Sequence, residues 1–261
     1  MIGNNTHVII TERDYRLFEV LAVLGVLLGA QIKIMWGGER ISARTVNERL
    51  FKLLAANLLK RWFLGTDAGG RKAVYGLTEK SAALIGSKLS PLARRSDSLL
   101  VADFFVQHKL LVAELWLAFR YSLPQQALFR RWQGFRSPLL SFLPLVPDGY
   151  VELESDQGVL AMFLEADRGT ESQTVFGKKV RLYLEFARSG EFERLFAQKK
   201  FRVLIVSESE RRLEPLRRTT AKITEKLFFF TTTECIKREG ILSAIWWRPS
   251  GEERHSLAKP L

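Results

Sequence analysis

The first third of the chain combines helical hydrophobic spacing with glycine interruptions. Apolar side chains recur every three or four positions between residues 11 and 24, and Thr11 followed by Asp14 is typical of a helix N-terminus. A second, short helix is predicted at 31–36, where a glycine pair follows it. Ser42 then precedes an amphipathic stretch that predicts a third helix, from residue 43 to about residue 57. The pattern therefore predicts three short helices before residue 58.

Two apolar stretches, 58–64 and 73–78, flank a segment rich in glycine and basic residues. This pattern predicts a β-hairpin with a basic tip. Three helices and then such a hairpin is the element order of a winged helix-turn-helix, in which one helix enters the major groove and the hairpin follows the DNA backbone. A helical bundle with a solvated charged face is the alternative. The winged-helix interpretation predicts six DNA-binding residues: Arg44, Thr45, Asn47, Arg49, Arg71 and Lys72.

A polar segment at 90–98 contains a proline and an Arg-Arg pair, which is typical of a linker. We therefore expect two domains, a winged helix-turn-helix at 1–97 and a second domain at 98–261. The first domain holds 15 basic and 8 acidic residues, and the second holds 25 and 20. Both domains are thus basic, and both are candidates for contact with nucleic acid.

Helix and strand patterns alternate through the second half. The predicted elements are a helix at 99–121, strands at 128–135, 145–153 and 159–166, a helix at 173–189, a strand at 201–206, a helix at 208–226 and a strand at 227–231. Residues 241–248 fit a strand or a helix, and the tail from Pro249 is expected to fray. This order is that of the restriction-endonuclease-like (PD-(D/E)XK-type) α/β core. The predicted fold class is therefore α+β, a winged helix-turn-helix followed by a nuclease-like domain.

Charge indicates the class of partner. The chain has 40 Lys and Arg against 28 Asp and Glu, a formal net charge of +12 and an isoelectric point near 10.0. Such a balance favours double-stranded DNA as a partner, with an anionic membrane surface second and a merely basic soluble protein as the alternative. The apolar run 20–30 is shorter than the roughly 20 residues of a spanning helix, so no membrane partner is expected.

A single cysteine, Cys235, excludes an intrachain disulfide and a multi-cysteine zinc site. A chain without disulfides fits a reducing compartment, and we expect a cytoplasmic protein. The three histidines, His7, His108 and His255, are scattered along the chain. They do not provide the His-x-His metal site of the commoner relaxases.

The acidic residues concentrate in one stretch. Between residues 148 and 171 there are seven acids and one base, inside a chain that is otherwise basic. Asp148 follows Pro147 in the first of two predicted strands, and Glu165 and Asp167 end the second. We assign three further acids of this stretch to a solvated hairpin: Glu152, Glu154 and Asp156.

In the restriction-endonuclease-like core, carboxylates on two neighbouring strands hold a divalent cation and a lysine assists beside them. Asp148 and Glu165 match the carboxylates, so Mg²⁺ or Mn²⁺ is the expected cofactor. Asp167 occupies the usual lysine position. Two explanations stay open: a basic residue of the next helix supplies the charge (Lys178, Lys179 or Arg181), or Asp167 is a third metal ligand. Glu114, on the helix at 99–121, is a further candidate metal ligand.

The chain resembles the plasmid replication-relaxation family, which is related to MobC-type mobilisation proteins. Short motifs carry this resemblance: residues 11–14, residues 75–78, His108 to Leu110 with Glu114, Pro147-Asp148, and residues 163–171 followed by Lys179 and Tyr183. The resemblance implies a DNA-binding protein of mobile elements with a nuclease-like second domain. It also implies a role for His108 near the site, whereas the pattern alone favours a packing residue.

Three functions follow as hypotheses. The first is a plasmid or mobile-element protein that acts in replication, relaxation or mobilisation and nicks DNA with a divalent metal. The second is a DNA-binding accessory protein with an inactive nuclease fold, which Asp167 in place of lysine favours. The third is an adaptor that recruits other replication or transfer proteins.

Overall fold

A computed structural model describes residues 8–65, 70–88, 99–125, 127–155, 158–169 and 171–258. The chain divides into two compact units, 1–117 and 118–261, and the division falls within one long helix, α5 (Leu99–Tyr121). The linker predicted at 90–98 lies outside the described residues. Each unit is a mixture of helices and strands, so the α+β class is confirmed.

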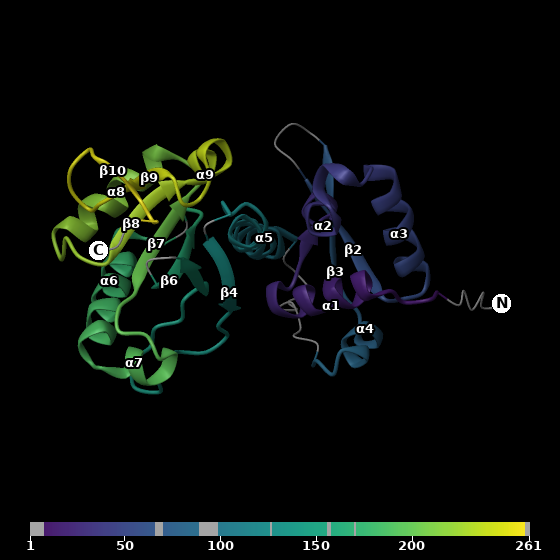
Figure 1. Ribbon diagram of the computed structural model, residues 1–261, viewed down its shortest axis with the longest axis horizontal. Helices are drawn as coiled ribbons and strands as arrows, with labels where there is room; N and C mark the ends of the chain where they lie inside the picture. Colours follow the sequence, from purple (N-terminus) through teal and green to yellow (C-terminus); the bar gives the residue numbers. More distant parts are fainter. Residues whose placement is uncertain are drawn as a thin grey trace. The chain divides into compact units, whose positions relative to one another are not determined.

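The first unit contains all three predicted helices and the predicted hairpin (Figure 1). Its elements are α1 (Glu12–Leu24), β1 (Leu27–Leu28), α2 (Gly29–Trp36), a 3₁₀ turn η1 (Gly38–Arg40), α3 (Ala43–Ala55), β2 (Leu59–Gly65), β3 (Arg71–Leu77) and α4 (Glu79–Leu84). The sequence did not predict β1 or α4. Both are too short to produce a hydrophobic period of their own.

Local capping explains where these helices begin. The Thr11 backbone N–H and hydroxyl both donate to Asp14 Oδ2 at 2.7 Å, which starts α1 at the predicted position. The Ser42 hydroxyl accepts a hydrogen bond from the Thr45 backbone N–H at 3.1 Å and starts α3. Gly37 ends α2 with a φ of +141°, a conformation that side-chain-bearing residues rarely adopt. These boundaries are set by neighbouring residues, so the sequence predicts them well.

The three strands of the first unit form an antiparallel sheet in the order β1-β3-β2. Its buried face includes Leu64, Val74 and Val26, which pack with Leu110 of α5. The Gln31 side chain also donates to the Leu110 carbonyl at 3.1 Å. The first part of α5 therefore contributes to the core of this unit.

The second unit contains a seven-stranded sheet whose strands follow one another in chain order, from β4 to β10. The strands are β4 (Ala127–Gln133), β5 (Gly149–Ser155), β6 (Gly158–Asp167), β7 (Arg202–Ser207), β8 (Phe228–Thr232), β9 (Ala244–Trp247) and β10 (Arg254–Ser256). The first three strands form an antiparallel meander, β6, β7 and β8 run parallel, and β9 and β10 are again antiparallel.

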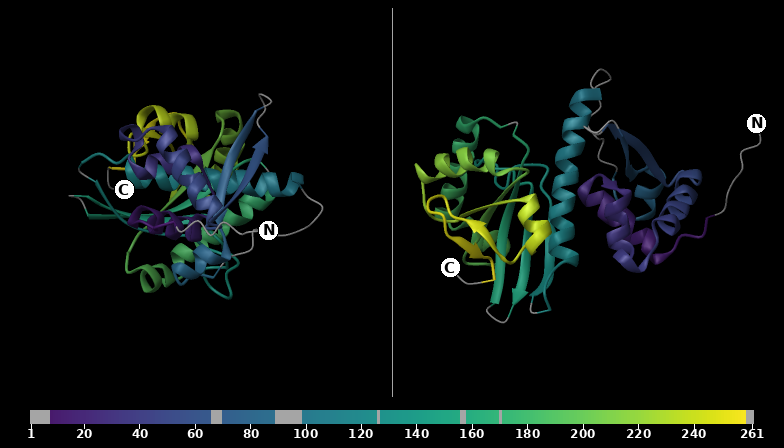
Figure 2. Two further views of the ribbon diagram at one scale, coloured as in Figure 1. Left: turned by 90° about the vertical axis from the view of Figure 1, so that its right-hand side faces the viewer. Right: turned by 90° about the horizontal axis from the view of Figure 1, so that it is seen from above.

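Helices connect the parallel strands: α6 (Gln173–Arg188) and α7 (Glu191–Phe196) lie between β6 and β7, and α8 (Glu210–Ala221) lies between β7 and β8. A further helix, α9 (Thr233–Glu239), connects β8 to the antiparallel β9. α6 and α8 pack side by side (Figure 1 and Figure 2). A Cβ on Gly177 of α6 would lie 3.4 Å from the Thr219 side chain of α8, about van der Waals contact, so the two helices are closely packed at this position.

Aromatic rings fill the core between the sheet and these helices. Phe163 of β6 lies at the centre of the cluster, with Tyr150 of β5 at 5.0 Å and Phe196 of α7 at 5.5 Å between ring centroids. Tyr183 and Phe186 of α6 also contact Phe163. Burial of these rings fixes α6 and α7 against β5 and β6, the two strands that carry the acidic residues.

The C-terminal part of the unit is a pair of strands. Residues 241–248 fit a strand or a helix, and within them 244–247 form strand β9. The tail is expected to fray, but it adds strand β10. That prediction is wrong because Leu257 is fully buried and its carbonyl accepts a hydrogen bond from Arg202. Polar composition alone does not reveal one buried anchor residue.

Within the described residues, the helices lack the length and apolar character that crossing a membrane would require.

Candidate functional site

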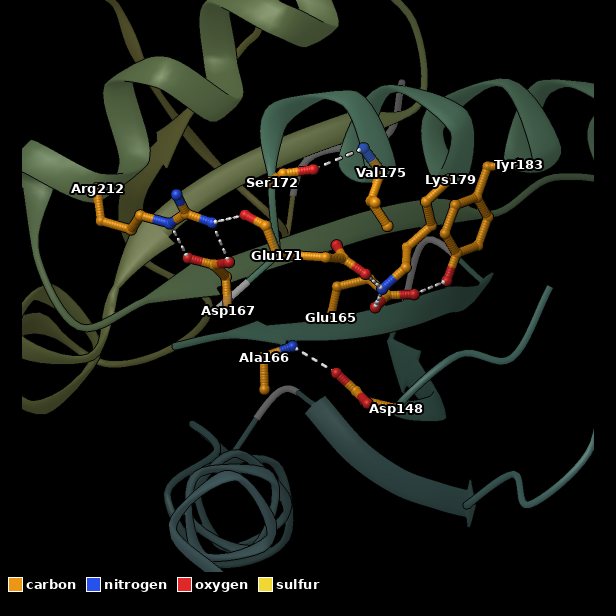
Figure 3. Close-up of polar contacts among 10 residues, drawn as sticks. All are labelled: Asp148, Glu165, Ala166, Asp167, Glu171, Ser172, Val175, Lys179, Tyr183 and Arg212. Atoms are coloured by element: carbon orange, nitrogen blue, oxygen red, sulfur yellow. Dashed lines mark hydrogen bonds and ion pairs between the residues drawn. The ribbon is translucent and has the colours of Figure 1, made fainter. Parts of the chain in front are cut away.

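Asp148 and Glu165 come together at the start of β5 and the end of β6. Strand pairing sets Gly149 opposite Leu164, which brings the preceding Asp148 beside Glu165. Asp148 directly precedes β5 rather than lying in the strand, and two hydrogen bonds hold it to β6. Its N–H donates to the Leu164 carbonyl at 3.1 Å, and its Oδ2 accepts from the Ala166 N–H at 2.8 Å (Figure 3).

Close packing helps to place Asp148. A Cβ on Gly149 would lie 2.6 Å from the indole of Trp132 on β4, so only glycine fits after Asp148 with this packing. Pro147 before it is buried. The Pro-Asp-Gly segment is therefore fixed on both sides of the carboxylate, which gives Asp148 a defined position.

Glu165 is almost fully buried, with 3% of its surface exposed. Its Oε2 accepts a hydrogen bond from the Lys179 ammonium at 2.9 Å, and its Oε1 accepts from the Tyr183 hydroxyl at 2.6 Å (Figure 3). Both donors lie on α6, four residues apart and therefore on one face of the helix. Burial raises the pKa of Glu165 to about 7. The Lys179 ammonium lowers this pKa and the charge of Asp148 raises it, so the two effects oppose each other.

Lys179 is the basic residue that α6 brings to this site. Its ammonium also lies 3.1 Å from Glu171 Oε1. Burial disfavours the charged ammonium, but the carboxylates of Glu165, Glu171 and Asp148 outweigh that effect and raise the pKa of Lys179. Of the other two candidates, Lys178 is exposed and Arg181 is exposed with its guanidinium bonded to the Gly177 carbonyl.

Asp167 has a different partner, which the sequence did not indicate. Arg212 of α8 donates to both of its carboxylate oxygens, at 2.7 and 2.9 Å, and to the Glu171 carbonyl at 2.6 Å. Hydrogen bonding to Asp167 raises the pKa of Arg212, so this arginine stays charged. The pair ties the end of β6 to α8 (Figure 3). Nothing in the spacing distinguishes Arg212 from the other arginines of α8.

Asp148 and Glu165 offer a donor set that suits Mg²⁺ or Mn²⁺. Mg²⁺ usually takes one or two protein carboxylates and keeps several waters. A cation here would offset both the burial and the repulsion from Asp148 that raise the pKa of Glu165. Among the described residues, no three His, Cys, Asp or Glu side chains gather closely enough to hold a metal. Glu114 and His108 lie on α5 within the first compact unit, and their roles stay predictions.

A comparison with protein families identifies the family of this chain. A family model described as replication-relaxation matches residues 18–198. The chain belongs to the replication-relaxation family. The match spans most of the first unit and the segment with Asp148, Glu165 and Lys179. Family membership indicates a DNA-related role in plasmid or mobile-element replication. Neither the curated proteins nor the solved structures contain a match to this chain.

One acid of this replication-relaxation protein departs from the prediction. Glu152, expected on a solvated hairpin, is 5% exposed. It accepts a hydrogen bond from the Tyr150 hydroxyl at 2.7 Å and pairs with Arg131 at 3.0 Å. The prediction is wrong because Arg131 neutralises a carboxylate that faces the aromatic core. Glu154 is exposed as expected, and Asp156 lies outside the described residues.

The predicted DNA-binding residues fall into two groups. Five of them are exposed on α3 or at the start of β3: Arg44, Thr45, Asn47, Arg71 and Lys72. Arg49 is instead bonded through Nε to Asp14 Oδ1 at 3.0 Å, and through Nη2 to the Ile9 carbonyl at 2.7 Å. Asp14 is 1% exposed; burial opposes its ionisation, but Arg49 and Thr11 lower its pKa. In this replication-relaxation protein, Arg49 thus joins α3 to α1.

Proposed function

We propose that this protein binds the DNA of a plasmid or mobile element through its first unit, acting in replication, relaxation or mobilisation. The unit has the element order of a winged helix-turn-helix, with α1, α2 and α3 followed by the β2–β3 hairpin. Arg44, Thr45 and Asn47 are exposed on α3, which suits contact with base edges. Arg71 and Lys72 are exposed beside the hairpin tip, which suits contact with phosphates.

The second unit, in this proposal, is a restriction-endonuclease-like domain that nicks DNA. Its order of α5, β4, β5, β6, α6 and β7 agrees with that core, although the short α7 precedes β7. The observation that carries the proposal is the 2.9 Å contact between Lys179 and Glu165. Through this contact, Lys179 of α6 brings a positive charge to the carboxylates. In the nuclease motif, a lysine at the position of Asp167 provides that charge.

Each residue has a distinct task in this mechanism. Asp148 and Glu165 would hold Mg²⁺ or Mn²⁺, which when bound stabilises charge on a phosphate and lowers the pKa of water. Lys179 presents an ammonium that can hold a phosphate oxygen beside the carboxylates. The Tyr183 hydroxyl fixes the orientation of Glu165 at 2.6 Å. Asp167 and Arg212 hold the end of β6 against α8 and have no direct part in the reaction.

Nicking of supercoiled plasmid DNA that carries the element's origin tests the proposal. With Mg²⁺ or Mn²⁺ present, we expect the wild type to produce nicked circles. Asp148→Asn and Lys179→Met should each reduce the rate by at least about 100-fold, because they remove a metal ligand and the phosphate-binding charge. Lys178→Met, a neighbouring exposed lysine, is the matched control and should nick normally. Absence of nicking by the wild type would reject the enzymatic role.

An accessory DNA-binding protein with an inactive site is the second candidate. Both oxygens of Glu165 are engaged, by Lys179 and by Tyr183, and this observation favours it. A metal would have to compete with both donors for the same carboxylate. This candidate predicts that origin DNA is bound but not cut, and that Asp148→Asn binds DNA as tightly as the wild type.

A further inference from the structure

Two phenylalanines of the first unit expose more than half of their surface beside one arginine. Phe51 of α3 is 57% exposed and Phe63 of β2 is 54% exposed. The Arg61 guanidinium carbon lies 5.3 Å from the Phe51 ring centroid and 5.1 Å from the Phe63 centroid. We call these three residues the Phe–Arg–Phe cluster. Single exposed apolar side chains are ordinary, but here two exposed phenyl rings both contact one guanidinium.

This surface is the exposed part of one face of β2. Arg61 and Phe63 are two residues apart and share that face, which becomes buried at Leu59, whereas Leu64 is buried on the other face. Trp62 also lies on the opposite face, where it packs across Gly76: a Cβ there would come within 2.9 Å of its ring. Trp62 is thus a packing residue, and the cluster is not required to complete the core.

The cluster lies in a strongly basic part of the chain. Residues 43–65 and 70–77, which form α3 and the hairpin, contain seven Lys or Arg and one acid, Glu48. Glu48 pairs with Arg44 at 2.8 Å. Strand pairing sets Arg71 opposite Gly65, on the same face of the sheet as Phe63. A ligand on this surface would therefore combine flat apolar groups with negative charge.

Unpaired nucleotides have both properties. Each base presents a π-face that can stack on a phenyl ring, and each phosphate carries a negative charge. In a duplex the faces of the bases are already stacked on one another, so they cannot stack on the two rings. Arg61 adds a cation between the rings, which favours base stacking further.

We propose that the Phe–Arg–Phe cluster is a stacking platform for the bases of single-stranded DNA. The proposal rests on the DNA-binding function proposed above and specifies a substrate: DNA with a melted segment beside the duplex. Phe51 and Phe63 stack the unpaired bases, while Arg61 and Arg71 neutralise the phosphates. A hydrophobic protein partner is the competing occupant of this surface.

Binding to matched oligonucleotides tests the platform. Fluorescence anisotropy would compare a labelled oligo-dT with an abasic strand of the same length, which has the same charge and no bases. We expect the wild type to bind oligo-dT roughly ten-fold more tightly than the abasic strand. Phe51→Leu and Phe63→Leu should each lose most of that difference, while Phe63→Tyr retains it. The salt dependence should not change, because no charge is removed.

Controls separate stacking from misfolding and from hydrophobic docking. Phe142→Leu alters a 67% exposed phenylalanine of the second unit and should bind both strands as the wild type does. Thermal melting of the leucine variants should match the wild type, since both rings are exposed. Equal wild-type affinity for oligo-dT and abasic DNA would overturn the proposal. Leucine variants that keep full oligo-dT affinity would also overturn it and would favour a protein partner.

Binding measurements with duplex DNA separate a failure of this inference from a failure of the proposed function. Origin duplex should be bound by the wild type and by Phe63→Leu alike, and weakened by the double variant Arg44→Ala/Asn47→Ala. If the wild type fails to bind duplex, the proposed winged-helix function fails. If duplex is bound but single strands show no dependence on bases, the stacking platform alone fails.

Discussion

Glu165 shows how burial and neighbouring charges compete at a single carboxyl group. Removal from water favours its neutral form, and the charge of Asp148 acts in the same direction. The Lys179 ammonium and Tyr183 hydroxyl favour the ionised form, but only partly compensate, so the pKa rises to about 7. Near neutral pH the Glu165 carboxyl group is therefore partly protonated and partly ionised. A divalent cation bound there would displace the proton, which links metal binding to pH.

This raised pKa predicts a pH dependence of stability. The folded protein holds the Glu165 proton up to about pH 7, whereas an unfolded chain releases it near 4.5. The folded state thus binds more protons in that window, and this group's contribution to stability falls as the pH rises through it. A glutamine side chain cannot ionise. The Glu165→Gln variant should therefore lack this decline in the free energy of unfolding, which is on the order of 1–3 kcal/mol in the wild type.

Urea unfolding at a series of pH values from about 4 to about 8 measures this effect. Glu154→Gln, which changes an exposed glutamate of β5, should leave the pH dependence of the wild type intact. A Glu165→Gln variant whose stability declines with pH as steeply as the wild type would show that Glu165 titrates normally.

At the scale of elements, ion pairs hold the helices to the ends of the strands. Asp167 at the end of β6 pairs with Arg212 of α8, and Lys179 of α6 bridges Glu165 and Glu171. The Asp167 side chain is 8% exposed and Arg212 is 24% exposed, so solvent screens their attraction only in part. Breaking one partner of such a pair leaves a poorly solvated charge, which costs more than the pair contributes.

A charge reversal tests this connection between β6 and α8. Asp167→Lys introduces the lysine of the proposed nuclease motif but sets two cations face to face, so we expect a loss of about 2–3 kcal/mol of stability. Adding Arg212→Glu should recover at least about 1 kcal/mol, because the ion pair is rebuilt in reverse. Arg211→Glu, an exposed neighbour on α8, serves as control and should not rescue. Additive effects of the two substitutions would mean that they do not interact.

For the whole molecule, the net charge of +12 predicts that the proposed binding to DNA depends on salt. Much of that charge belongs to α3 and the β2–β3 hairpin, where basic side chains are exposed. Phosphate contacts release counterions, so each lost contact lowers both affinity and salt dependence. The slope of affinity against salt therefore reports the total number of phosphate contacts, and the change in slope on mutation reports those proposed for the hairpin.

The double variant Arg71→Ala/Lys72→Ala should weaken binding to origin duplex and reduce the salt slope by about two. Titrations at several salt concentrations measure both quantities. Arg238→Ala, which removes an exposed arginine of α9 paired with Glu239, should keep the wild-type slope. An unchanged slope in the double variant would remove the hairpin from the DNA interface.

The sequence by itself determined the elements whose ends depend on near neighbours. Thr11 with Asp14, and Ser42 with Thr45, start α1 and α3 as predicted, because a cap is made within three residues. The hydrophobic periodicity of the sequence predicted the long helices and the buried strands. It missed short elements such as α7, since a six-residue helix depends on packing Phe192 and Phe196 into the aromatic core.

Only the tertiary structure decided which charged side chains meet. Arg212 reaches Asp167 across 45 positions of the chain, and Glu152 is buried because Arg131 of the neighbouring strand neutralises it. The sequence offered Lys178, Lys179 and Arg181 as candidates, and the tertiary structure places the Lys179 ammonium against Glu165. Ion pairing depends on distance in space, which sequence spacing does not encode. The acids were therefore found from the sequence, and their partners from the fold.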